Sequence, residues 1–228
     1  MKTRREKNYI KMPAFATRLY DNLTSIKGAD RSFEEIADFM VGVLPKGRLL
    51  DVGTGQGPLI IAMSNKNPAL DLSGIDTDDS LLAIARKNIR SIKGVDLRVG
   101  NIIKTEYADD FFDSIVSAGS FHDWDNPAEG LDEIFRILKP GRTAYIFDTH
   151  RDYHRKILRR RLAVYLRDYP FVRKRILIHF LKRQLRMTYS LPEFEAIVKQ
   201  TKFSSNYSIR EIELGNLPMY VRMELRKE

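Results

Sequence analysis

DVGTGQG, residues 51–57, decides the fold class of this chain. The stretch follows Leu49 and Leu50, which indicate a buried strand, and the Pro58 behind it suits the first turn of a helix. Three alternating glycines at such a point indicate backbone at positive φ, or backbone so close to a ligand that no Cβ fits. Because ligands of open parallel sheets bind beyond the carboxyl ends of strands, the stretch predicts a strand–turn–helix unit with a ligand at the turn.

Strands and helices alternate along the rest of the chain. The apolar runs that predict strands lie at 48–52, 70–75, 95–99, 113–117 and 143–147. The residues that would open helices are Ser32 with Glu35, Asp78 or Asp79, Asn126, and Ser190. Two extended segments, 207–214 and 219–225, follow and are joined by a short Gly-Asn turn. The pattern predicts an α/β, Rossmann-like fold: a seven-stranded, mostly parallel, doubly wound sheet with an antiparallel C-terminal edge hairpin.

The composition is that of an ordinary folded protein. The chain has 228 residues, of which 43% are hydrophobic, enough for one core. It contains no cysteine, which excludes disulfides, thiolate metal sites and a cysteine nucleophile, and we predict no metal site. No apolar run approaches the roughly 20 residues that span a bilayer, and the basic N-terminal segment lacks the apolar stretch of a secretory signal. We therefore expect a cytoplasmic protein.

The net charge of +9 comes from one segment of the chain. Residues 148–186 contain 13 Lys and Arg against three Asp, and the remainder is nearly neutral. Two amphipathic helices, 153–167 and 171–186, are predicted within a basic helical cap insertion at 148–189. Several interpretations stay open for this cap: a lid with a solvated face, a surface for an anionic membrane or a nucleic-acid backbone, or a contact for an anionic small substrate.

The spacing of the glycines narrows the choice of ligand. A dinucleotide fingerprint reads G-x-G-x-x-G, whereas residues 53–57 read G-x-G-x-G, and Asp51 in front of them disfavours a phosphate. A ligand with a positive charge and no phosphate fits better, and S-adenosylmethionine (SAM) is one. Asp76, 23 residues after Gly53, closes the second predicted strand, where a carboxylate can bind both ribose hydroxyls. NAD would use the same carboxylate, and the alternative role of Asp76 is simply to begin the next turn.

Five motifs occur in order along the chain. They are DVGTGQG at 51–57, GID at 74–76, VGN at 99–101, FDSIVSAGSFHDW at 112–124 and EIFRILKPG at 133–141. Together they resemble the class I SAM-dependent methyltransferases, most of all the branch that includes ubiquinone/menaquinone-biosynthesis-type small-molecule enzymes. The resemblance covers residues 15–147 and 190–203. It implies a single SAM-dependent methyltransferase domain over residues 1–228, with an N-terminal helical segment at 1–45.

The resemblance also implies a set of cofactor-binding residues. Asp51, Gly53 and Gly55 would line the methionine portion of SAM, and Asp76 would hold the ribose. Asn101 would contact the adenine; the family commonly has Asp there, and an Asn carbonyl still accepts from the adenine amine. The remaining members are Tyr20, which would reach over the cofactor, Ile102, which would pack on the adenine, Ser117, which would face the amino-acid end, and Thr54, Gln56, Gly57 and Thr77.

The chemistry asks little of the protein beyond positioning. Methyl transfer from a sulfonium is an in-line displacement on an activated carbon, so holding donor and acceptor about 3–3.5 Å apart supplies much of the rate. The segment SFHDW, 120–124, would lie over the methyl group. His122 is the first candidate for a general base and Asp123 the second, while Phe121 and Trp124 would form an apolar acceptor wall. The alternative role for His122 is structural, or a contact to SAM.

Three functions follow from this reasoning. The first is a SAM-dependent methyltransferase that acts on a small, apolar or anionic acceptor. The alternative is an RNA methyltransferase that holds nucleic acid with residues 148–189, although no separate RNA-binding module is recognisable. The second alternative is a non-catalytic SAM-binding regulatory protein. For the first function we expect a cytoplasmic enzyme whose cap also offers a peripheral contact to an anionic membrane surface.

Overall fold

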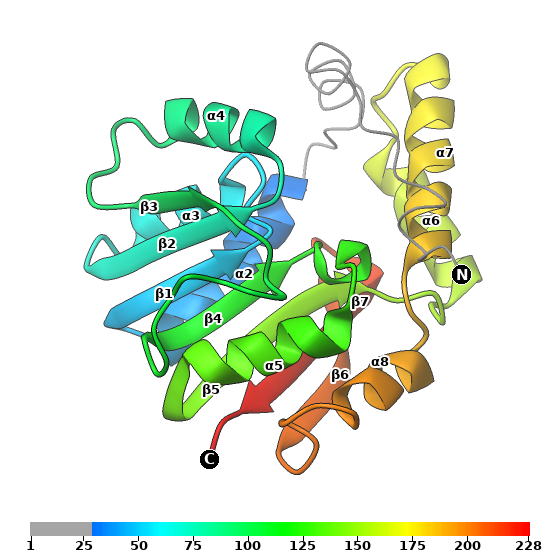
Figure 1. Ribbon diagram of the computed structural model, residues 1–228. Coiled ribbons are helices and arrows are strands. Elements are labelled where there is room, and N and C mark those ends of the chain that lie inside the picture. The colour runs from blue at the N-terminus through cyan, green and yellow to red at the C-terminus, as the bar shows by residue number, and fades with distance from the viewer. Residues whose placement is uncertain (1–28) are drawn as a thin grey trace.

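The computed structural model describes residues 29–228, except for the side chains of residues 29, 30 and 180 (Figure 1). Tyr20, and with it most of the predicted 1–45 segment, lies outside the described residues. The described part confirms the predicted fold class, because it forms a twisted sheet with helices on both faces (Figure 1).

Seven strands form one sheet in the order β3-β2-β1-β4-β5-β7-β6. The first five, β1 to β5, pair in parallel, and β7 is antiparallel to both β5 and β6. The Gly215-Asn216 turn joins β6 and β7, so the predicted edge hairpin is confirmed. The bounds of the strands are β1 Gly47–Val52, β2 Leu70–Asp76, β3 Asp96–Val99, β4 Phe112–Ala118, β5 Leu138–Thr149, β6 Tyr207–Leu214 and β7 Leu217–Arg226.

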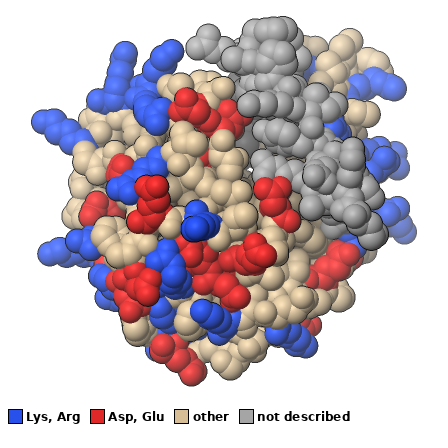
Figure 2. All heavy atoms as spheres, in the orientation of Figure 1, with Lys and Arg blue, Asp and Glu red and all other residues tan. Residues whose placement is uncertain are grey.

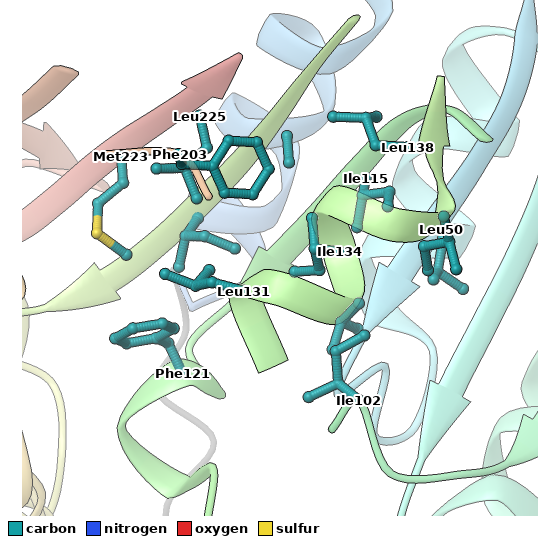
Figure 3. Close-up of a cluster of buried hydrophobic side chains, with 14 of the residues drawn as sticks. Leu50, Ile102, Ile115, Phe121, Leu131, Ile134, Leu138, Phe203, Met223 and Leu225 are labelled. Carbon is teal, nitrogen blue, oxygen red and sulfur yellow. The ribbon is translucent and has the colours of Figure 1, made fainter. Parts of the chain in front are cut away.

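Helices cover the sheet on two sides and bury a hydrophobic core on each. Neighbouring residues of β1 serve opposite sides: Leu49 belongs to the core beneath α2 and α3, and Leu50 to the core beneath α5 and α8. This division explains why the strand reads as a continuous apolar run. Figure 3 shows the second core, with side chains of α5 among those of the central strands. These helices are α2 Ala29–Val43, α3 Pro58–Lys66, α4 Asp79–Asn88, α5 Pro127–Ile137 and α8 Leu191–Val198.

Three of the predicted helix starts are confirmed by their caps. The side chains of Asp78 and Asn126 accept hydrogen bonds from the first turns of α4 and α5, and Ser190 forms a capping box with Glu193 at α8. The prediction for Ser32 is wrong, because α2 begins three residues earlier, at Ala29. Ser32 instead lies inside the helix, buried, and is hydrogen-bonded with Tyr220 of β7.

The strand β5 is longer than the sequence predicts. It starts at Leu138, five residues before the predicted Thr143, and pairs there with Phe112 across an irregularity in the register. The helix α5 ends at Ile137, just before Lys139-Pro140-Gly141, as expected, but these three residues already belong to β5.

The basic insertion 148–189 contains the two predicted helices, α6 Arg155–Tyr165 and α7 Phe171–Met187. A separate apolar cluster joins this pair to β7, with Leu158 and Leu185 on Met219. The two ends of the insertion meet, because the amide of Arg151 donates to the carbonyl of Tyr189 over 3.1 Å. The insertion is thus a helical hairpin tied to the sheet at its base. Among the described residues, no helix has the length and apolar character needed to cross a bilayer.

Candidate functional site

The glycine turn after β1 adopts the conformation that its sequence predicts. Gly53, Gly55 and Gly57 have φ of 73°, 54° and 82°, in the left-handed region that favours glycine. At Gly53 space matters as well, since a Cβ would lie 2.3 Å from the side chain of Ser120. The amides of Gly53 and Thr54 both donate to the carbonyl of Ile75, at 2.9 and 3.0 Å, which fixes the turn against β2.

Asp76 holds the loops after β1 and β2 together. One carboxylate oxygen accepts the amide of Gly55 at 2.9 Å, and the other accepts the amide of Asp78 at 2.9 Å. Burial raises the pKa of Asp76, and hydrogen bonds from the backbone of Asp78, Gly55 and Thr77 oppose that rise. A carboxylate has about four acceptor sites, so the three backbone amides do not use all of them. Because Asp76 is only partly buried, such sites are available to hydroxyl donors of a ligand.

Asp51 lies below the same turn and is 2% exposed. Burial raises the pKa of Asp51 to about 7, and the charge of Asp76 adds to the rise. Two carboxyl groups therefore share one turn, and this electrostatic setting disfavours an anion and favours a cation.

The carboxyl ends of β1 and β4 are joined through Ser120, which the sequence analysis did not single out. Its hydroxyl donates to the carbonyl of Val52 at 2.9 Å, lies 2.8 Å from the hydroxyl of Ser117, and accepts the indole N–H of Trp124 at 3.2 Å. Ser117 is fully buried in this network. Ser117 was predicted to face a ligand, but its hydroxyl is not exposed. It would therefore affect a ligand through its hydrogen bond with Ser120.

His122 points at Asp148 rather than into open space. Its Nδ1 is 2.8 Å from Oδ1 of Asp148, its backbone amide donates to Oδ2 at 2.9 Å, and its side chain is 5% exposed. Burial lowers the pKa of His122, but the charge and hydrogen bond of Asp148 outweigh burial and raise it to about 9. A protonated imidazole cannot accept a proton, so this geometry favours a positioning role. Asp123 stays exposed, 3.6 Å from His122 Nε2.

The two aromatic residues predicted to form an acceptor wall differ in exposure. Phe121 is fully buried and packs on Phe194 of α8, with ring centroids 5.6 Å apart. Trp124 is partly exposed and lies against Gly130, where a Cβ would come within 2.8 Å of the indole. Only Trp124 therefore offers surface to a ligand as the site stands.

The loop after β3 brings Asn101 and Ile102 to the same edge of the sheet. The amide of Gly100 donates to the carbonyl of Asp76 at 2.9 Å, which places this loop beside the end of β2. The side-chain carbonyl of Asn101 accepts the amide of Ile103 at 3.2 Å. Ile102 is 4% exposed and belongs to the core. Thr77 and Gln56 complete the loops after β2 and β1.

His150 is a second residue that the sequence analysis missed. It follows β5 two positions after Asp148 and is fully buried, and neither ring nitrogen has a hydrogen-bond partner among the described residues. Burial lowers the pKa of His150, which favours the neutral form of the ring. The Asp-x-His pattern directly after the predicted strand 143–147 was the sequence signal that could have identified His150. Within residues 29–228, no group of three or more His, Asp or Glu could hold a metal ion.

Comparison with known proteins relates the part of the chain that holds this site to a protein family. Residues 50–146 match a family described as a methyltransferase domain. This segment is thus similar to methyltransferase domains. It includes the glycine turn, Asp76, Asn101, Ser120 and His122, whereas Asp148, His150 and the helical cap lie beyond the matched residues.

Relatives of this segment include enzymes of quinone biosynthesis. The ubiquinone/menaquinone biosynthesis C-methyltransferase UbiE of Geotalea daltonii is 30% identical over 135 residues, which cover 57% of each chain. The demethylmenaquinone methyltransferase of Chlorobaculum parvum is 38% identical over 102 residues, 44% of this chain and 40% of that protein. The chain thus spans about half the length of the curated relatives it matches.

Solved structures of methyltransferases share the fold over nearly the whole chain. The plantazolicin methyltransferase BpumL, in complex with a triazolic desmethylPZN analogue and S-adenosylhomocysteine (SAH), has a TM-score of 0.68 at 20% identity. The match covers 93% of this chain and 90% of that one. A SAM-dependent methyltransferase from Aquifex aeolicus has a TM-score of 0.62 at 17% identity, covering 94% and 98%. The likeness therefore includes the cap and the C-terminal hairpin.

Proposed function

We propose that this protein is a SAM-dependent methyltransferase that acts on a small acceptor of apolar or anionic character. The observation that carries the proposal is the clasp between Asp76 and Gly55, which joins the loops after β1 and β2 at the carboxyl edge of a segment similar to methyltransferase domains. Two relatives are named as a ubiquinone/menaquinone biosynthesis C-methyltransferase and a demethylmenaquinone methyltransferase, and their names support the proposal, as does the SAH in the BpumL complex.

The residues at this edge fit SAM by their chemistry. Asp76 is a partly buried carboxylate that can accept from a ribose hydroxyl, and the turn at Gly53 and Gly55 lets a ligand approach the backbone. Asp51, whose pKa is about 7, can ionise below the turn when a ligand brings an ammonium and a sulfonium. We assign the adenine to the loop with Asn101 and Ile102. Thr54, Gln56, Gly57, Thr77 and Ser117 belong to the same loops and strand ends.

SAM supplies a methyl group on an already activated carbon, and the protein contributes position. Asp148 holds the segment 120–124 through both the imidazole and the amide of His122. With its pKa near 9, His122 is protonated at neutral pH and acts as a positioning residue in this proposal. Asp123, which is exposed, remains the candidate for a general base. Trp124 is the partly exposed aromatic residue beside them and would contact the acceptor.

The chain would work as one unit, with residues 148–189 as the cap on the acceptor side. Neither an RNA methyltransferase nor a regulatory SAM-binding protein is named among the relatives above. We therefore carry the small-molecule enzyme forward as the proposed function.

Calorimetry with SAH tests the site. Asp76→Asn removes one of the two charged oxygens of the clasp, and we expect at least a roughly tenfold loss of SAH affinity. The matched control is Asp71→Asn, at the opposite end of β2, where the carboxylate is exposed and forms an ion pair with Arg48. Equal SAH affinity in all three proteins would refute the assignment of Asp76, and no SAH binding by the wild type would refute the proposed function.

A further inference from the structure

Exposed apolar side chains gather on the helical hairpin formed by α6 and α7. Six large apolar residues are exposed in the described part of the chain, and four of them lie between residues 157 and 172. Val164, Phe171 and Val172 are 70%, 71% and 68% exposed, more than any of the others. Single exposed apolar residues are normal on soluble proteins, whereas three such residues within nine positions mark an interaction surface.

The fold places these residues together at the tip of the hairpin. Val164 lies in the last turn of α6, and Phe171 and Val172 open α7, so all three flank the connection between the helices. The opposite faces of both helices are buried through Leu162 and Leu177, which leaves the three residues facing outward. Figure 1 shows the start of α7 at the top of the view, at the end of the helix farthest from α8 and the edge of the sheet.

The tip is also strongly basic. Arg160, Arg167 and Arg175 are exposed around the apolar residues, and the guanidinium of Arg175 lies 5.8 Å from the centre of the Phe171 ring. Between residues 153 and 186 the sequence has a single acidic residue, Asp168. Figure 2 shows Lys and Arg side chains along the right-hand edge of the molecule, where α7 lies in Figure 1.

We propose that the tip of the α6–α7 hairpin docks on an anionic lipid bilayer. Apolar side chains ringed by arginines match the boundary between the acyl chains and the headgroups of a bilayer. The apolar side chains would insert among the acyl chains, and the arginines would contact the phosphates of the headgroups. A nucleic-acid backbone would explain the arginines alone, because two of the three apolar residues are valines and offer no ring for base stacking. The inference rests on this surface and does not depend on the proposed methyl transfer.

Flotation with vesicles tests the apolar part of the tip. The wild type should float with vesicles of phosphatidylcholine mixed with phosphatidylglycerol and remain unbound with phosphatidylcholine alone. Val164→Ser, Phe171→Ser and Val172→Ser combined should lower the partition coefficient by roughly tenfold or more. The control is Val43→Ser with Val99→Ser, which removes exposed apolar side chains elsewhere, 42% and 55% exposed, and should bind like the wild type.

A second pair of variants tests the charge. Arg160→Gln, Arg167→Gln and Arg175→Gln combined should weaken binding to the anionic vesicles about a hundredfold at low salt, since each basic residue near such a surface contributes about a fivefold factor. The matched control changes the net charge equally at three exposed residues in and after α4, Lys87→Gln, Arg90→Gln and Lys93→Gln. It should lose far less affinity than the tip variant.

Thermal unfolding and SAH calorimetry on every variant separate this inference from loss of the fold or of the proposed cofactor site. The proposal is overturned if the wild type ignores anionic vesicles, if it binds neutral vesicles equally well, or if the serine variant floats like the wild type. Steep, salt-dependent binding to single-stranded RNA that the serine variant retains, without vesicle binding, would overturn it in favour of a nucleic acid.

Discussion

The pairing of His122 with Asp148 predicts a specific dependence of stability on pH. The pKa of His122 is raised from its ordinary 6.5 to about 9 in the folded protein, against the opposing effect of burial. The folded state therefore binds the proton more tightly than the unfolded state does. The resulting stabilisation is fully present below the unfolded pKa of 6.5 and is lost as the pH rises through about 9. This difference in pKa corresponds to about 3 kcal/mol of unfolding free energy.

The variant Asp148→Asn removes the charge while it keeps the shape of the side chain. Below about pH 6.5 we expect it to lose about 3 kcal/mol or more, because a buried imidazolium would lack its counter-ion. Above about pH 9 the difference from the wild type should shrink by a similar amount. Urea unfolding across this range measures both, and Trp124, which is the single tryptophan of the chain, reports on the same segment by fluorescence.

Two controls isolate the pair. His122→Gln should remove the same part of the pH dependence, whereas Asp123→Asn, whose carboxylate is exposed, should leave it nearly intact. An NMR titration that shows His122 titrating near its ordinary pKa would refute the reasoning. So would a variant at Asp148 whose unfolding free energy keeps the wild-type slope between about pH 6.5 and pH 9.

Three further outcomes follow from the turn and its neighbours. Gly53→Ala should lower the free energy of unfolding in urea by about 2 kcal/mol or more and weaken SAH binding. The φ of residue 53 is 73°, and the Cβ of an alanine there would meet the side chain of Ser120. Ser120→Ala should lower the free energy of unfolding by about 1–3 kcal/mol, because the indole N–H of Trp124 loses its acceptor. Ser120→Thr keeps the hydroxyl but changes the side-chain volume, so it should lose less stability than Ser120→Ala if the hydrogen bond is the cause. SAM binding near pH 7 should release protons from Asp51, measured by calorimetry in buffers of different ionisation enthalpy; equal heats would contradict this.

Local signals in the sequence were enough for the sheet and most helix starts. Leu49 and Leu50 face opposite cores, which is why their apolar run predicted a buried strand, and Asp78, Asn126 and Ser190 cap the helices that they were expected to cap. Such features depend on residues a few positions apart, so that a single sequence reveals them.

The features that the sequence did not reveal depend on distant partners. Ser32 matched a capping box with Glu35, but Glu35 instead accepts the amide of Gly215, 180 residues away, and α2 starts earlier. Ser120 bonds to Val52, 68 residues away, and His122 to Asp148, 26 residues away. The sequence placed these residues near the site by their position after a strand, but pairing across the sheet decides what each side chain contacts.

A crystal structure of the protein with SAH tests the central claim most directly. The account predicts that the ribose hydroxyls bind the carboxylate of Asp76, with the amino-acid end at the turn of Gly53 and Gly55 and the adenine beside Asn101. SAH bound elsewhere on the molecule, or a ribose held by another residue while Asp76 keeps only its backbone amides, would contradict it.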